Sequence, residues 1–246
     1  MKKLIALFLV ALTLSGCAAI EKQAFNREAH STIRKIALIE PRPSTGFGIS
    51  VQNHPAMHLG LIGAVAYSAE MTSKSNSLDA VMKPLNWSLT STLISAIADE
   101  LTKSGYEVVR VDMKRDSLTL VKDYTEYKTS PAFAPALSAD AWVDVATRDP
   151  LYVANGPTSD YVPSIGLTVR MVSAKDQTIL YREDFFYGYA FPTGRLQPVL
   201  LPSESAFRFA NMDALTADPK KTLEGIAKGV PLLAKKVAED MAPARR

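Results

Sequence analysis

"PLNWSLTSTLISAIADELTKSGYEVVRVD", residues Pro84–Asp112, is the stretch that decides the fold class. Large apolar side chains recur every fourth residue from Leu85 to Leu101, which is the spacing of one face of an α-helix. Gly105 stands where a helix C-terminus is commonly capped. We therefore expect a helix from about Pro84 to Lys103, followed by a strand over Tyr106–Asp112.

The residues before this stretch add a second strand. "IRKIALIEP", Ile33–Pro41, is a β-branched run that a proline ends. A strand, a helix and a strand in this order are typical of an α/β layer. Between them, residues 42–57 carry prolines and glycines and are expected to form a loop. Leu59–Met71 is apolar and rich in small residues, and the polar stretch "TSKSNS" should end it.

The residues after it predict the rest of a mixed sheet. "DAWVDVATR", Asp140–Arg148, is a further strand, and "YVPSIGLTVRMVSA" and "QTILYREDFFYGYA" form a hairpin about "KDQ". Asp218 and Pro219 begin a closing amphipathic helix, which Gly229 and Pro231 should kink or split. Residues 113–138 and 192–215 show no pattern. The expected fold class is α/β (α+β), with a mixed central sheet flanked by helices.

The beginning of the chain has the layout of a secretory leader. Lys2 and Lys3 precede an apolar run from Leu4 to Leu14, and the small residues Ser15 and Gly16 follow. The run is shorter than the roughly 20 residues that a membrane-spanning helix needs. We expect residues 1–16 to be a cleaved signal peptide, residues 17–32 a lipidated start and tether, and residues 33–246 one periplasmic domain.

Leu14-Ser15-Gly16-Cys17 resembles the lipobox of bacterial lipoproteins at all four positions. The resemblance implies that Cys17 carries a diacylglycerol on its sulfur and an acyl group such as palmitate on its new amino terminus. More than one acyl chain would make a stable membrane anchor. No aspartate follows the cysteine, and in this family that favours the outer membrane.

Composition limits what else the chain can do. Cys17 is its one cysteine, so no internal disulfide supports the fold. The net charge of +3 falls to +1 once Lys2 and Lys3 are removed, so no strong field attracts nucleic acid.

Candidate enzyme chemistry is weak. His54 and His58 have the spacing of two metal ligands on a helix, but Pro55 lies between them and no further ligands accompany them. Asp140 and Asp144 point to one face of their strand, yet they are roughly 13 Å apart along it. We expect a solvated strand face there, and no catalytic residue, metal or cofactor beyond the covalent lipid.

Two features favour binding instead. Tyr181, Phe185, Tyr187, Tyr189 and Phe191 alternate onto one strand face, which is either core under the closing helix or a docking surface. Phe185 and Tyr187 fit core better, whereas Tyr189 and Phe191 should be exposed. The other feature is Leu59–Met71, where Leu59, Gly60 and Gly63 would allow close contact with the body, with another subunit or with a membrane.

The order of elements resembles a family. The lipobox, the strand "KIALIEP", the helix ending in "LTKSGYEVV", the strand "ADAWVDV" and the hairpin "YVPSIGLTVRMVSAKDQTILYRE" are similar to small bacterial outer-membrane lipoproteins with a fold like the curli secretion lipoprotein and the amino-terminal domain of TolB. The resemblance covers about residues 33–242. It implies a periplasmic body on an outer-membrane lipid anchor, with no catalytic residues to transfer.

The sequence thus predicts a lipid-anchored periplasmic accessory or scaffold protein of an envelope assembly or transport system. It would act by binding an envelope protein or a second copy of itself. The alternative is an oligomeric ring or pore subunit in outer-membrane secretion, which would use Leu59–Met71 or the loop Pro192–Pro202. A periplasmic hydrolase using Asp140 or Asp144 is a third reading.

Overall fold

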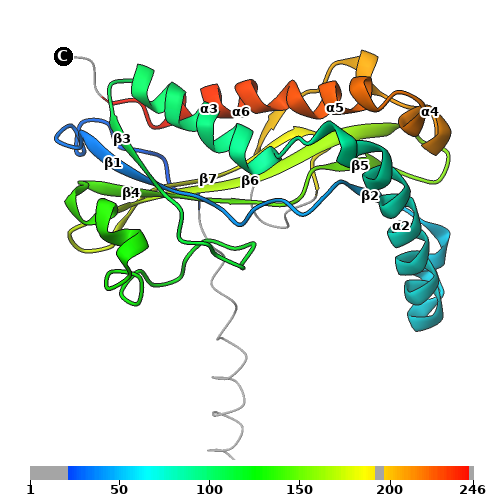
Figure 1. Cartoon of the computed structure of the whole chain (residues 1–246), viewed down its shortest axis with the longest axis horizontal. Coiled ribbons are helices and arrows are strands. Elements are labelled where there is room, and N and C mark those ends of the chain that lie inside the picture. The colour runs from blue at the N-terminus through cyan, green and yellow to red at the C-terminus, as the bar shows by residue number, and fades with distance from the viewer. Residues whose placement is uncertain (1–21, 192–196, 244–246) are drawn as a thin grey trace, which may run out of the picture.

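The computed structural model describes residues 22–191 and 197–243 and has the expected α+β class, a curled mixed sheet flanked by helices (Figure 1). Its described strands are β1 Lys35–Ile39, β2 Gly48–Val51, β3 Glu107–Val111, β4 Ala141–Thr147, β5 Leu151–Ala154, β6 Tyr161–Ser173, β7 Ile179–Gly188 and β8 Val199–Leu201. Its helices are α2 Gly60–Met82, α3 Leu89–Lys103, α4 Met212–Ala217, α5 Pro219–Ala227 and α6 Gly229–Asp240, with short 3-10 turns η1 Pro55–His58, η2 Lys83–Leu85, η3 Pro131–Ser138 and η4 Ser205–Phe207.

The long strand β6 organises the sheet. β7 pairs antiparallel with β6 along one edge, and β8 extends that side in parallel with β7. On the other edge, β4 pairs with the C-terminal half of β6 and β5 pairs with the N-terminal half. β1 lies parallel between β4 and β3, so the strands before and after α3 are neighbours in the sheet.

Helices α3, α5 and α6 cover one face of the sheet (Figure 1). The fourfold stripe of α3 is buried there, and Gly105 adopts φ +101° immediately after the helix, where side chains other than hydrogen are strained. Asp218 caps α5 by accepting a 3.1 Å hydrogen bond from the Lys221 backbone, and the closing helix splits at Gly229 as expected.

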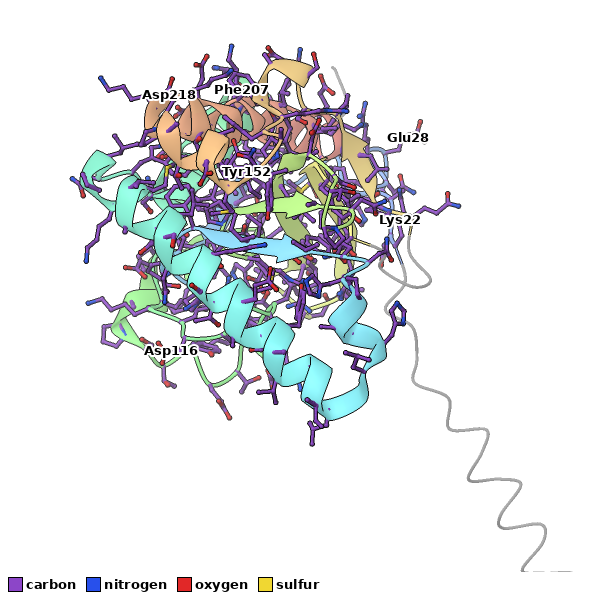
Figure 2. The ribbon with its side chains drawn as sticks, turned by 90° about the vertical axis from the view of Figure 1, so that its right-hand side faces the viewer. Lys22, Glu28, Asp116, Tyr152, Phe207 and Asp218 are labelled. Atoms are coloured by element: carbon purple, nitrogen blue, oxygen red, sulfur yellow. The ribbon has the colours of Figure 1, made fainter. Side chains whose placement is uncertain are left out.

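The opposite face is covered by the segment that had no sequence pattern. Val121, Tyr124, Phe133 and Ala136 pack on Trp142 and Ile39, which makes a second apolar core. Figure 2 labels Asp116 in this segment, on the far side of the sheet from Asp218. The expectation of a solvated strand face is therefore wrong for β4 itself, which is buried along its whole length because residues 113–138 fold over it.

Two local expectations fail nearer the N-terminus. Residues 42–57 are not only loop, because Gly48–Val51 forms β2 and pairs with β5. Helix α2 runs on through "TSKSNS" to Met82. Its Leu78 and Met82 are buried in the main core, and that burial outweighs the weak helix preference of the polar residues before them.

Residues 22–32 are attached to the body instead of forming a free tether. Gln23 makes a bridge to Arg182 on β7, and Lys22 forms an ion pair with the buried Glu183. The Phe25 side chain is 9% exposed and belongs to the main core. The expectation of a tether over the whole of residues 17–32 is therefore wrong for its described part. The signal peptide and the lipobox residues Leu14, Ser15, Gly16 and Cys17 lie outside the described residues.

Candidate interaction site

The N-terminal end of α2 carries the most exposed large apolar side chains described. Leu61 and Ile62 are each 83% exposed and Leu59 is 70% exposed. Both views show this end of the helix projecting beyond the body (Figures 1 and 2). We call these side chains the apolar tip; they are Met57, Leu59, Leu61, Ile62 and Val65.

The tip projects because only the second half of α2 has a body to pack on. Met71, Leu78 and Met82 face the core, while the first turn contacts η1. Gly63 is buried against η1, and a Cβ there would overlap the Ala56 carbonyl oxygen. The sequence left open whether Leu59–Met71 packs on the body or contacts another subunit or a membrane. Met71 packs on the body, whereas Leu59 is exposed and available for such a contact.

The surface of the tip is also short of charge. From Pro55 to Ala69 the chain has no Asp, Glu, Lys or Arg. Single exposed apolar residues are ordinary, but clusters of large ones without charges are typical of contact sites. Of the predicted interaction residues, Leu59 lies in this cluster, Gly60 forms its turn at φ +60°, and Gly63 supports it from beneath.

One histidine near the tip, His54, has structural partners. His54 Nδ1 accepts a 3.2 Å hydrogen bond from the Ala56 backbone, and its Nε2 lies 3.2 Å from Glu70 Oε2. A hydrogen bond from Lys74 holds the pKa of Glu70 below its usual range. Among the described residues no group of three metal-binding side chains gathers, around His54 or elsewhere.

The aromatic stripe on β7 divides at Gly188. Tyr181, Phe185 and Tyr187 are buried under the helical layer, so Tyr187 is not part of an interaction surface. The reason is Gly229, which brings the start of α6 against the Tyr187 ring. Tyr189 and Phe191 are half-buried instead of exposed; their rings meet edge to face at 5.4 Å.

Asp144 contradicts the prediction of a solvated strand face, because it is fully buried under residues 113–138. Arg115 Nη1 donates to its Oδ1 at 2.6 Å. The Val121 backbone and the Tyr124 hydroxyl donate to its Oδ2 at 2.7 and 3.0 Å. Arg170 completes this set, which we call the buried charge cluster: Arg115, Tyr124, Asp144 and Arg170.

The cluster was missed because two of its members lie in the unpatterned segment. Arg115 and Tyr124 read as ordinary loop residues, and only their contact with Asp144 gives them a role. Burial beside Asp144 raises the pKa of Tyr124, so its hydroxyl stays a donor. Asp140 lies apart from Asp144 at the exposed start of β4, where Oδ2 accepts from the Arg34 and Lys35 backbones at 2.8 and 2.9 Å.

Within the ranges that the structure covers, no helix has both the length and the hydropathy of a transmembrane segment. α2 has 23 residues but is only moderately apolar.

Comparisons with known proteins identify no family. No family model and no curated protein matches the chain. Among solved structures, the PelC dodecamer from Paraburkholderia phytofirmans is similar at 10% identity and a TM-score of 0.38, covering 92% of this chain and 97% of that one. A Xanthomonas campestris protein of the family model DUF330 is similar at 10% identity and 0.38, covering 83% and 81%. The similarity of this chain to the curli secretion lipoprotein and to TolB stays a prediction.

Proposed function

We propose that this chain is a lipid-anchored, non-catalytic accessory protein on the periplasmic face of the outer membrane, and that it binds another envelope protein through the apolar tip. The observation that carries the proposal is the exposure of Leu59, Leu61 and Ile62 on a projecting helix end. Burying such side chains removes about 25 cal/mol of unfavourable free energy per Å² of apolar surface. A contact of this kind needs no catalytic residue.

The ion pair between Lys22 and Glu183 supports a short connection between the lipid anchor and the folded body. If Cys17 is acylated, it lies five residues before Lys22, which is held by Glu183 on β7. Five extended residues span at most about 18 Å. The anchor would therefore hold the body close to the bilayer, and confinement to one surface raises the effective concentration for a partner on that surface.

The two carboxylates considered for hydrolysis support a non-catalytic role. Asp144 has both oxygens occupied by buried donors and no access to solvent. Asp140 uses Oδ2 to hold the backbone at the start of β1. A general acid or base must reach its substrate, and the buried Asp144 side chain cannot do so. We propose no cofactor other than the covalent lipid.

Site-specific photo-crosslinking in cells tests the binding surface. A photoreactive residue at Leu61 should give a discrete crosslinked product, whereas one at Lys235, whose side chain is 69% exposed on α6, should not. Equal products at both positions, or none at Leu61, would reject the tip as the binding surface. A separate test of the anchor is Cys17→Ser, which should move the protein out of the outer-membrane fraction.

A ring or pore subunit is the second candidate. Beyond the tip, the exposed side of α2 continues as a shallow hollow of small residues that includes Ala69, Thr72 and Asn76. A second copy could seat a helix there. The mass of the full-length protein in detergent separates the candidates, because a monomer excludes the ring and a multiple of the chain mass that Leu61→Ser abolishes supports it.

A further inference from the structure

A cleft of about 450 Å³ lies on the sheet face away from the helices, between β6, β7 and the chain around Leu118–Lys122. One wall is held in place by the buried charge cluster: Val121 donates to Asp144, and its carbonyl accepts from Arg170. The cleft is therefore a built feature of the fold, because residues 118–122 cannot move off the sheet without breaking those bonds.

The floor of the cleft carries uncompensated positive charge. Asp144, Arg170 and Arg182 lie in register side by side across β4, β6 and β7. Asp144 is already shared between Arg115 and Arg170, and Asp184 lies two residues from Arg182 on the same face, so two carboxylates face three guanidinium groups and the floor keeps a net positive charge. Like charges opposite one another on neighbouring strands are unfavourable unless something compensates them.

Arg182 is the cation on this floor that has no paired carboxylate among the described residues. Among the described residues its guanidinium has no hydrogen bond or ion pair, and its Nε is buried without a partner. The neighbouring Asp184 accepts a 2.6 Å hydrogen bond from Thr168. Burial lowers the pKa of Arg182, and the positive charge of the neighbouring Arg170 lowers it further. The negative charge of Asp184 raises it. An unpaired buried donor on a cation is costly, and an anion would satisfy it.

Beside the charged floor, part of the cleft lining is apolar. Phe186 lies beside Gly166 on the floor, and Leu118 lines one side. Lys122 and Arg148 add positive charge at the lining.

We propose that this cleft binds an amphipathic anion, with its carboxylate or phosphate on the Arg182 guanidinium and its apolar part against Phe186. Binding removes the imbalance of charge on the floor and pairs the unsatisfied donor. The proposal does not depend on the apolar tip or on acylation of Cys17, because the cleft lies wholly within the folded body.

Isothermal titration calorimetry on the full-length protein tests the proposal with 2-naphthoate and 2-naphthyl phosphate as probes. The neutral 2-naphthamide, which has nearly the shape of naphthoate, is the matched control, and each is also titrated into detergent alone. Both anions or one of them should bind in preference to the amide, and which one binds separates a carboxylate ligand from a phosphate ligand.

Arg182→Met should weaken binding of the preferred anion about 10- to 100-fold, as expected for loss of a hydrogen bond to a charged group, and leave the amide unaffected. Lys235→Met should change neither. Because Arg182 repels Arg170, Arg182→Met should also unfold at the same urea concentration as the parent or a higher one. No binding of either anion at millimolar concentration, equal binding of anion and amide, or a loss of stability in Arg182→Met would overturn the proposal.

Discussion

Nη1 of Arg115 lies 2.6 Å from Oδ1 of Asp144, and neither side chain is more than 3% exposed. The pair joins a segment without sequence pattern to the centre of the sheet. Burying two charges is costly in itself, so such a pair specifies the position of a segment more than it adds stability. Here it fixes where residues 113–124 cross β4.

Asp144→Asn should destabilise the protein by about 3–5 kcal/mol, because it leaves Arg115 and Arg170 buried without a counter-charge. Urea unfolding followed by circular dichroism measures the change. The control is Glu100→Gln, which breaks the exposed ion pair with Lys103 and should cost at most about 1 kcal/mol. Equal losses in the two variants would mean that the cluster does not hold the segment.

Gly229→Ala should destabilise by about 1–3 kcal/mol, because the added methyl group overlaps the Tyr187 ring where α6 meets β7. Gly156→Ala is the matched control. A Cβ there has Ser159 Oγ 3.6 Å away as its nearest neighbour, an ordinary contact, so the change should stay within about 0.5 kcal/mol. If Gly229→Ala is neutral or stabilising in urea, α6 does not pack as closely on β7 as described.

A leucine-to-alanine change should have very different effects on the free energy of unfolding in the buried half and in the exposed half of α2. Leu78→Ala should cost about 2–5 kcal/mol, because that side chain is fully buried. Leu61→Ala should change the free energy of unfolding by less than about 0.5 kcal/mol, because its side chain is 83% exposed. A large loss for Leu61→Ala in thermal or urea unfolding would show that the apolar tip is covered within the folded chain.

Alkaline pH should destabilise the protein, because its buried tyrosines resist losing their protons in the folded state. Burial raises the pKa of Tyr106 to about 12, above the ordinary 10 that it has in the unfolded chain. The folded state therefore holds the proton longer, so stability is full below pH 10 and falls as the pH rises toward 12. Burial raises the pKa of Tyr187 to about 12 in the same way.

The urea midpoint measured from pH 8 to pH 11 checks this expectation. Tyr106→Phe removes one titrating group together with a 2.5 Å hydrogen bond to the Met241 carbonyl. The variant should be less stable at pH 8 and should lose less stability than the parent above pH 10. Parallel curves for the two proteins would rule out Tyr106 as a source of the alkaline loss.

The sequence by itself determined the elements whose patterns are local. The fourfold stripe of α3, the β1 run, the β6–β7 hairpin and the split closing helix depend on neighbours in the chain, and each was predicted from its periodicity or cap. Core packing of Phe185 under a helix followed from alternation along one strand. The lipobox is also a local pattern, and it stays a prediction.

Only the tertiary structure decided which face of each pattern is covered. Asp144 was predicted to be solvated because residues 113–138 have no periodicity that would place Arg115 and Tyr124 above it. β2 is four residues long and is specified by its partner β5. Likewise, Leu61 is exposed and Leu78 is buried on the same helix because the folded body ends between them. The sequence next to each leucine does not show where the body ends.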